Sequence, residues 1–118
     1  MSTVDEAGAR ARNVVSLAGR VSSAPVEREL PSGDKVVTFR IVMAREQTAM
    51  TARSKQVSDW VDCAVWAARL RRSVASWQVG DQVEVEGALR RRFFRDAGGS
   101  SSRVEIEVLS GRRIERTR

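Results

Sequence analysis

Residues 58–66 read SDWVDCAVW, a stretch in which apolar side chains recur at every second position. Successive side chains of a β-strand point to opposite faces, so this period of two predicts a half-buried strand. Its core face consists of Val61, Cys63 and Val65. Trp60 and Trp66 then fall on the opposite face, together with Asp62 and Ala64. Tryptophans on the non-core face of a strand suggest a binding surface, because a large apolar ring is costly to leave in water.

Two strands are predicted on the N-terminal side of this stretch, because residues 13–21 (NVVSLAGRV) and 35–44 (KVVTFRIVMA) both alternate. Their core faces consist of Val15, Leu17, Gly19 and Val21 in the first and of Val37, Phe39, Ile41 and Met43 in the second. The other face of the second strand consists of Thr38, Arg40 and Val42. Between the two strands lie a short extended piece, residues 26–30, and the sequence PSGD at 31–34. The proline and glycine of PSGD favour a tight turn, so a hairpin connection is predicted here.

Residues 46–57, EQTAMTARSKQV, are mostly polar and show no consistent period. We predict that they form a long, mobile loop. Loops of about a dozen residues in a compact domain are usually functional or disordered. Arg53 and Lys55 lie in this loop and are candidates for contact with an anionic ligand.

The apolar spacing becomes helical after residue 66. Leu70, Val74 and Trp77 predict one short amphipathic helix over residues 67–77, with Trp77 as its anchor in the core. Alternation returns in two further strands, residues 82–94 and 103–109, which are joined by a flexible turn, DAGGSS, at residues 96–101. The inward positions of the first of these strands are Val83, Val85, Gly87 and Leu89.

The order of these elements predicts an all-β fold with one helix. Five antiparallel strands with a short α-helix between the third and fourth describe the oligonucleotide-binding, or OB, barrel. A chain of 118 residues has room for one such domain. The predicted organisation is a flexible N-terminal extension at residues 1–12, the barrel at 13–114 and a basic C-terminal end at 115–118.

Charge and missing residue types limit the function classes. A net charge of +6, from 21 basic and 15 acidic residues, favours a polyanionic partner, because each neutralised phosphate releases condensed counterions. The chain has no histidine, the commonest general base and metal ligand, and its single cysteine, Cys63, is predicted to be buried and inert. We therefore predict a protein that is not an enzyme and needs no metal or cofactor. No signal peptide or apolar run of about 20 residues is visible, so we expect a cytoplasmic location without membrane contact.

Aromatic and basic residues on the predicted non-core faces form a candidate surface for single-stranded nucleic acid. Bases stack on flat aromatic rings and phosphates need cations, and each stacked base contributes about 1–3 kcal/mol. A regular pleat in the run RRRFFR, residues 90–95, places Arg90, Arg92 and Phe94 on one face. The candidate binding residues are Trp60, Trp66, Phe94, Arg90, Arg92, Arg40, Arg53 and Lys55.

Structural explanations of the same residues stay open. Trp60 and Trp66 could instead pack under the long loop or in a subunit interface. The arginines at 90–92 could form a solvated run that protects a strand edge. Arginines of the predicted helix, Arg69, Arg71 and Arg72, are expected on its solvated face.

Five segments also resemble, in order and spacing, those of the bacterial single-stranded-DNA-binding protein family. They are NVVSLAGRV, LPSGDKVVTFRIV, SDWVDCAVW, VGDQVEVEGALRRRFFRD and SRVEIEVLSG. The resemblance runs from about Asn13 to Ile114. The resemblance implies an OB barrel, usually assembled as a homotetramer, with a dimer as the alternative. It also implies binding of single-stranded DNA without sequence preference, in replication, recombination or repair, and hence association with the nucleoid. Trp60, Trp66 and Phe94 match the stacking positions of the family.

The chain departs from the family pattern in two places. Gln47 and its neighbours stand where the family often has another stacking tryptophan. The sequence ends on a basic segment rather than on an acidic, hydrophobic tip, so recruitment of partner proteins through such a tip is not expected. The competing hypothesis is an OB-fold interaction module that docks a partner subunit through its aromatic face.

Overall fold

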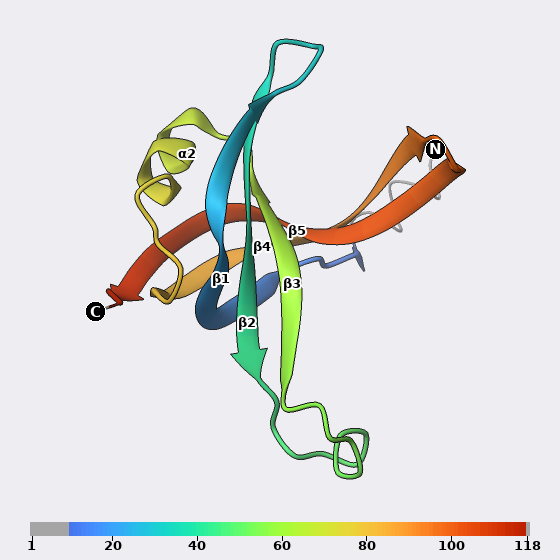
Figure 1. The fold of residues 1–118 in the computed structure, drawn as a ribbon, viewed down its shortest axis with the longest axis vertical. Coiled ribbons are helices and arrows are strands. Elements are labelled where there is room, and N and C mark those ends of the chain that lie inside the picture. Colours follow the sequence, from blue (N-terminus) through green and yellow to red (C-terminus); the bar gives the residue numbers. More distant parts are fainter. Residues whose placement is uncertain (1–9, 118) are drawn as a thin grey trace.

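The structure is a computed structural model that describes residues 10–117. Five strands close into a barrel in the order β1-β2-β3-β5-β4 (Figure 1). The elements are β1 Val15–Glu29, β2 Lys35–Ala44, β3 Ser58–Val65, α2 Ala68–Val74, β4 Gln82–Asp96 and β5 Gly99–Glu115. The predicted five-stranded OB barrel, with a helix between the third and fourth strands, is confirmed. Most of the predicted N-terminal extension, residues 1–9, lies outside the described residues.

β1 joins two segments that the sequence predicts as separate pieces, residues 13–21 and 26–30. Its first half pairs with β4 and its second half pairs with β2. The register shifts twice between Val21 and Val26, and such bulges bend a strand and increase its twist. Pro25 lies in this irregular region, where a residue without an N–H is tolerated. The bend allows one strand to pair on both sides and so helps to close the barrel.

One strand pair differs from the prediction of an entirely antiparallel sheet. β3 and β5 are parallel, with Cys63 opposite Ile106 and Ala64 opposite Glu107. The chain leaves β3, passes through α2 and runs along β4 before it turns back into β5. Because β4 and β5 form an antiparallel hairpin, β5 enters the sheet in the same direction as β3. The barrel therefore closes through a parallel seam that the alternation of side chains does not show.

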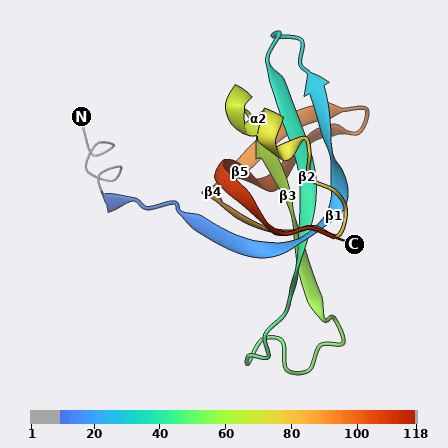
Figure 2. The same cartoon turned by 90° about the vertical axis from the view of Figure 1, so that its left-hand side faces the viewer.

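The core lies inside the barrel and beneath the helix. It contains the buried inward residues of all five strands, among them Val21, Val37, Ile41, Val65 and Val85. Trp77 is 5% exposed, and its ring meets that of Phe39 edge to face at 5.4 Å and 82°. The predicted core position of Trp77 is thus confirmed. Figure 2 shows α2 lying against the barrel.

The helix ends earlier than predicted. α2 ends at Val74, and the next residues form tighter i→i−3 bonds, from Ser76 N to Ser73 O and from Trp77 N to Val74 O. Gly80 follows with φ +98°, in the left-handed region that favours glycine. Residues 75–77 therefore form a turn rather than helix, and this turn still directs Trp77 into the core.

The β4–β5 hairpin is much longer than predicted. β5 begins at Gly99 rather than at residue 103, and Asp96 pairs with Gly99 across a short turn. The backbone of the serines at 100–102 pairs with β4 although their side chains show no apolar alternation. The hairpin projects from the barrel as an arm (Figure 1). Leu89, predicted to face the core, lies opposite buried Ile106 but is 48% exposed, because the arm leaves the barrel at this level.

Asp81 ties the C-terminal end of β5 to the turn before β4. Its buried carboxylate accepts hydrogen bonds from the backbone N–H groups of Thr117 and Gln78, each at 2.8 Å. A guanidinium nitrogen of Arg113 lies 3.7 Å from the same carboxylate. The N–H bonds from Thr117 and Gln78 lower the pKa of Asp81, and they outweigh the opposing effect of burial. Of the basic end predicted at 115–118, Thr117 is thus tied to the barrel, and residue 118 lies outside the described residues.

Candidate nucleic-acid interface

Four neighbouring strands present one continuous surface, which we call the outer face. On β2 and β3, Arg40 lies opposite Asp62 and Val42 opposite Trp60. On the arm, three pairs share this face: Arg90 with Glu105, Arg92 with Arg103, and Phe94 with Ser101. The parallel seam joins the two halves, since Ala64 of β3 lies beside Glu107 of β5. The structure therefore places Trp60, Arg40, Arg90, Arg92 and Phe94 on the outer face.

Trp60 is the most exposed aromatic residue of the outer face, at 57%. The guanidinium carbon of Arg40 lies 3.9 Å from the centroid of its ring, well within the range of a cation–π contact. Asp62 accepts a hydrogen bond from Nε of Arg40 at 2.9 Å and so fixes the guanidinium in this position. Arg40 therefore supports the indole, and much of the ring remains exposed.

Trp66 differs from Trp60 although the two have the same parity. It follows the last residue of β3 and is half-buried. Its carbonyl oxygen accepts a hydrogen bond from Nε of Arg71, which also pairs with Glu27 at 2.7 Å. Arg71, predicted on the solvated face of the helix, therefore has a structural role at this corner. Trp66 offers less ring surface than Trp60.

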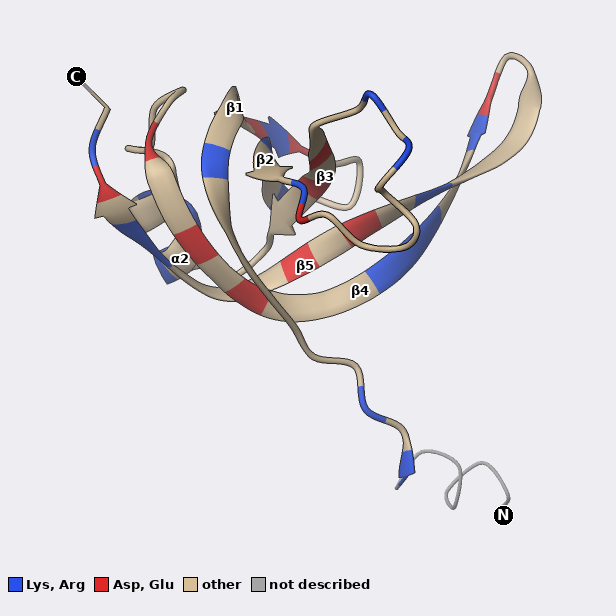
Figure 3. Ribbon diagram, turned by 90° about the horizontal axis from the view of Figure 1, so that it is seen from below, with Lys and Arg blue, Asp and Glu red and all other residues tan. Residues whose placement is uncertain are grey.

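The arm carries a row of cations, and each predicted arginine there has a carboxylate partner. Arg90 pairs with Glu107 at 3.0 Å, and Arg92 lies 3.6 Å from Glu105. Figure 3 shows acidic residues on the barrel half of β4 and basic residues where the strand enters the arm. The positive charge of the arginine run therefore lies on the arm, and the carboxylates of Glu105 and Glu107 neutralise part of it.

Phe94 and Phe93 point to opposite sides of the arm. Phe94 is half-buried on the outer face, and the guanidinium carbon of Arg103 lies 5.3 Å from its ring centroid. Phe93 lies on the other side and is 75% exposed. The pleat predicted from parity thus separates two adjacent phenylalanines, and Phe94 alone joins the outer face.

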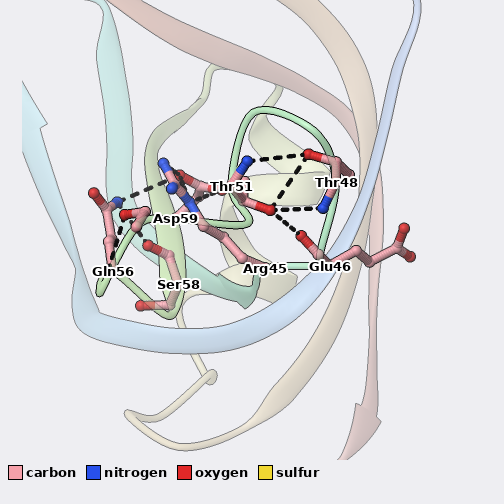
Figure 4. A network of polar contacts seen from close by, with 8 residues as sticks. Arg45, Glu46, Thr48, Thr51, Gln56, Ser58 and Asp59 are labelled. Atoms are coloured by element: carbon pink, nitrogen blue, oxygen red, sulfur yellow. Dashed lines mark hydrogen bonds and ion pairs between the residues drawn. The ribbon is translucent and has the colours of Figure 1, made fainter.

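The loop between β2 and β3 contains turns held by side chains. Arg45 pairs with Asp59 at 3.0 Å, and Thr51 exchanges hydrogen bonds with Thr48 and donates one to the carbonyl oxygen of Glu46 (Figure 4). The loop projects from the end of the barrel opposite to the β1–β2 hairpin (Figure 1). Arg53 and Lys55 are exposed on it. The structure does not bring these two cations beside the residues of the arm.

A small depression of about 90 Å³ on the outer face is lined by residues of all five strands. It is lined by Ser23, Arg28, Thr38, Phe39, Asp62, Cys63, Arg92, Arg103 and Glu105. Arg28 and Arg103 are absent from the candidates drawn from the sequence. The parity of Arg103 with Glu105 already places it on an outward face, but the register that sets it opposite Arg92 cannot be read from the sequence. For Arg28, the bulges in β1 conceal the parity.

The single cysteine of the chain, Cys63, borders this depression. Burial, together with the negative charges of Asp62 and Glu105, raises the pKa of Cys63 to about 12, so the thiol stays neutral and unreactive. The predicted burial of this cysteine is confirmed. Among residues 10–117, no cluster of three or more acidic or cysteine side chains could hold a metal ion. Within the same residues, no helix is long and apolar enough to cross a membrane.

A closed five-stranded barrel with aromatic and arginine side chains on one face defines an OB-fold protein of the kind that binds single-stranded nucleic acid. The chain belongs to the single-strand binding protein family: the model described as "Single-strand binding protein family" matches residues 12–114. This confirms the family that the sequence resembles.

Relatives in bacteria and one solved structure agree with this membership. A "Single-stranded DNA-binding protein 2" of Streptomyces avermitilis is 35% identical over 106 residues, which cover 82% of this chain and 62% of the relative. A protein of the same name from Listeria innocua serovar 6a is 28% identical over 87 residues, 74% of this chain and 54% of the relative. The chain thus spans little more than half the length of these relatives. The structure described as "Plasmodium falciparum SSB complex with ssDNA" matches with a TM-score of 0.72 and 25% identity, covering 92% of this chain and 97% of that one.

Proposed function

We propose that this protein binds single-stranded DNA without sequence preference, through the outer face of residues 13–114. The single observation that carries the proposal is Trp60, a 57% exposed indole supported by Arg40 in the middle of a surface with several arginines. A base that stacks on this ring removes apolar surface from water, and every base has a suitable face. The similar structure with bound single-stranded DNA supports the same choice of ligand.

We assign the stacking of bases and the attraction of phosphates to different residues. Trp60 is the main stacking platform, while Trp66 and Phe94, both half-buried, offer smaller ones. Arg40, Arg90 and Arg92 supply positive charge near the bases, and Arg53 and Lys55 extend it onto the loop. Stacking on an aromatic ring and contact with phosphates do not depend on which base is present, so we expect sequence-tolerant binding.

We also propose a homotetramer. Apolar side chains on the far side of the arm support it: Phe93 is 75% exposed, Leu89 48% and Val104 39%. They occupy neighbouring positions of the β4–β5 ladder, and an exposed group of this kind marks a contact surface. A light-scattering mass near four chains is expected, whereas a mass of one chain at micromolar concentration would contradict the assembly.

The proposed setting follows from the ligand. Single strands arise in replication, recombination and repair, so we place the protein in the cytoplasm at the nucleoid.

The function is tested by fluorescence anisotropy with labelled oligo-dT and with a duplex of the same length. Tight, salt-sensitive binding of the single strand and much weaker binding of the duplex are expected. Equal affinities would contradict the proposal.

A further inference from the structure

The depression on the outer face brings together three arginines and two carboxylates. Arg28 comes from β1, Arg92 and Arg103 come from the two strands of the arm, and Asp62 and Glu105 come from β3 and β5. Their charges add to a net positive site. The pairing of these groups decides which cations remain available.

Both carboxylates of the depression already have a cation. Asp62 accepts a hydrogen bond from Arg40 at 2.9 Å, and Glu105 lies 3.6 Å from Arg92. Glu105 is only 6% exposed, and removal of Arg92 would leave a buried carboxylate without its cation. Arg40 and Arg92 are thereby committed to structural pairs.

Arg28 and Arg103 have no carboxylate partner among the residues that the structure describes. Arg103 contacts the ring of Phe94, with its guanidinium carbon 5.3 Å from the ring centroid, and this contact leaves its N–H donors available. Arg103 also lies directly opposite Arg92 across the arm. Like charges at directly opposed positions of a sheet are unfavourable, and a bound anion would remove that repulsion.

Two hydroxyl groups complete the lining. Ser23 on β1 and Thr38 on β2 both border the depression. Hydroxyl donors beside two guanidinium groups match the oxygens of a phosphate, which accept several hydrogen bonds at once. The depression, at about 90 Å³, has room for a group of phosphate size.

We propose that this depression is a subsite for one phosphodiester of the bound strand, held by Arg28 and Arg103. Arg40, Arg90 and Arg92 instead stay with their carboxylates and shape the stacking platform. The inference rests on the proposed single-strand binding and assigns the phosphate contacts to two arginines outside the aromatic platform.

The test is a salt series of oligo-dT titrations with Arg28→Gln, Arg103→Gln and the double variant. Each single variant is expected to bind about tenfold more weakly at low salt, because a charge-assisted contact is lost. The slope of log K against log salt is expected to become shallower by about 0.7 for each arginine, the value for one phosphate contact on a single strand. A deoxyribose-phosphate oligomer without bases should compete with oligo-dT for binding to the wild type. The same oligomer should no longer compete for binding to the double variant.

The matched control is Arg69→Gln, which removes the same charge from an exposed position of α2. It should leave the slope unchanged, and melting temperatures should show that all variants fold. If the wild type binds oligo-dT and the Arg28→Gln and Arg103→Gln variants show the same salt slope as the wild type, the subsite alone is overturned. Failure of the wild type to bind oligo-dT would instead overturn the proposed function and the subsite together.

Discussion

The guanidinium of Arg40 lies 3.9 Å from the centre of the Trp60 ring, and Asp62 holds it there through a 2.9 Å hydrogen bond. Three residues on two adjacent strands thus form a layered unit in which the indole is supported from one side. A base that stacks on Trp60 meets a ring that is already oriented. Binding then costs less ordering of side chains than it would on a freely rotating tryptophan.

The first prediction concerns this ring. Trp60→Leu should weaken oligo-dT binding by about 1–3 kcal/mol, or about 5- to 150-fold, because leucine is apolar but has no π-face. Trp60→Phe, which keeps a ring, should lose clearly less. Anisotropy titrations at one salt concentration compare the two variants. Equal losses in both would show that apolar contact, rather than stacking, explains the role of Trp60.

The second prediction concerns the buried partner of Arg92. Arg92→Gln should lower the free energy of unfolding by about 1–3 kcal/mol, because Glu105 is left without its cation. Adding Glu105→Gln in the same chain should recover much of this loss, since no charge is then left unpaired. Urea unfolding of the wild type, both single variants and the double variant forms the required cycle. Strictly additive effects would contradict the coupling.

The barrel can be predicted from the sequence because its core faces alternate cleanly. The strands at 35–44 and 58–66 show this, and the structure returns nearly the same bounds. The first half of the arm is also visible, since Arg90, Arg92 and Phe94 keep the parity of β4. The other half is not, because β5 begins with serines that pair only through their backbone.

Register explains most of what sequence reasoning missed in the site. Arg103 can be recognised as a candidate only when it is known to lie opposite Arg92. Arg28 can be recognised only when the bulges of β1 are known. The ion pairs are equally hidden, because a list of arginines does not distinguish those held by carboxylates from those that are available. The positions of the arginines in the sequence therefore predict the binding surface, but they do not predict which arginines are free to contact a ligand.

The third prediction uses the buried carboxylate at the end of β5. The hydrogen bonds from Thr117 and Gln78 depress the pKa of Asp81, so the charged form stabilises the fold. This contribution is complete above the unfolded-state value of about 3.9 and is lost as pH falls through the lower folded-state pKa. Asp81→Asn should therefore melt below the wild type at pH 7, and the gap should narrow at pH 3. A gap that stays constant or widens in acid would contradict the assignment.

The fourth prediction concerns the cysteine beneath the outer face. With its pKa raised to about 12, Cys63 is almost entirely protonated at pH 8, and only the thiolate attacks an aromatic disulfide reagent. The native protein should react on the order of a thousandfold more slowly than a free thiol, and at the normal rate in denaturant. Rapid labelling of the folded protein would show that the depression is open down to Cys63.

The central claim is that a single strand binds across the outer face with a base on Trp60, and tryptophan emission tests it most directly. Wild type and Trp60→Phe are titrated with oligo-dT at low salt, with anisotropy recorded on the same samples to confirm binding. We predict saturable quenching in the wild type and loss of most of its amplitude in Trp60→Phe, although that variant still binds. Quenching of equal amplitude in both proteins, or bound DNA without quenching in the wild type, would contradict the account.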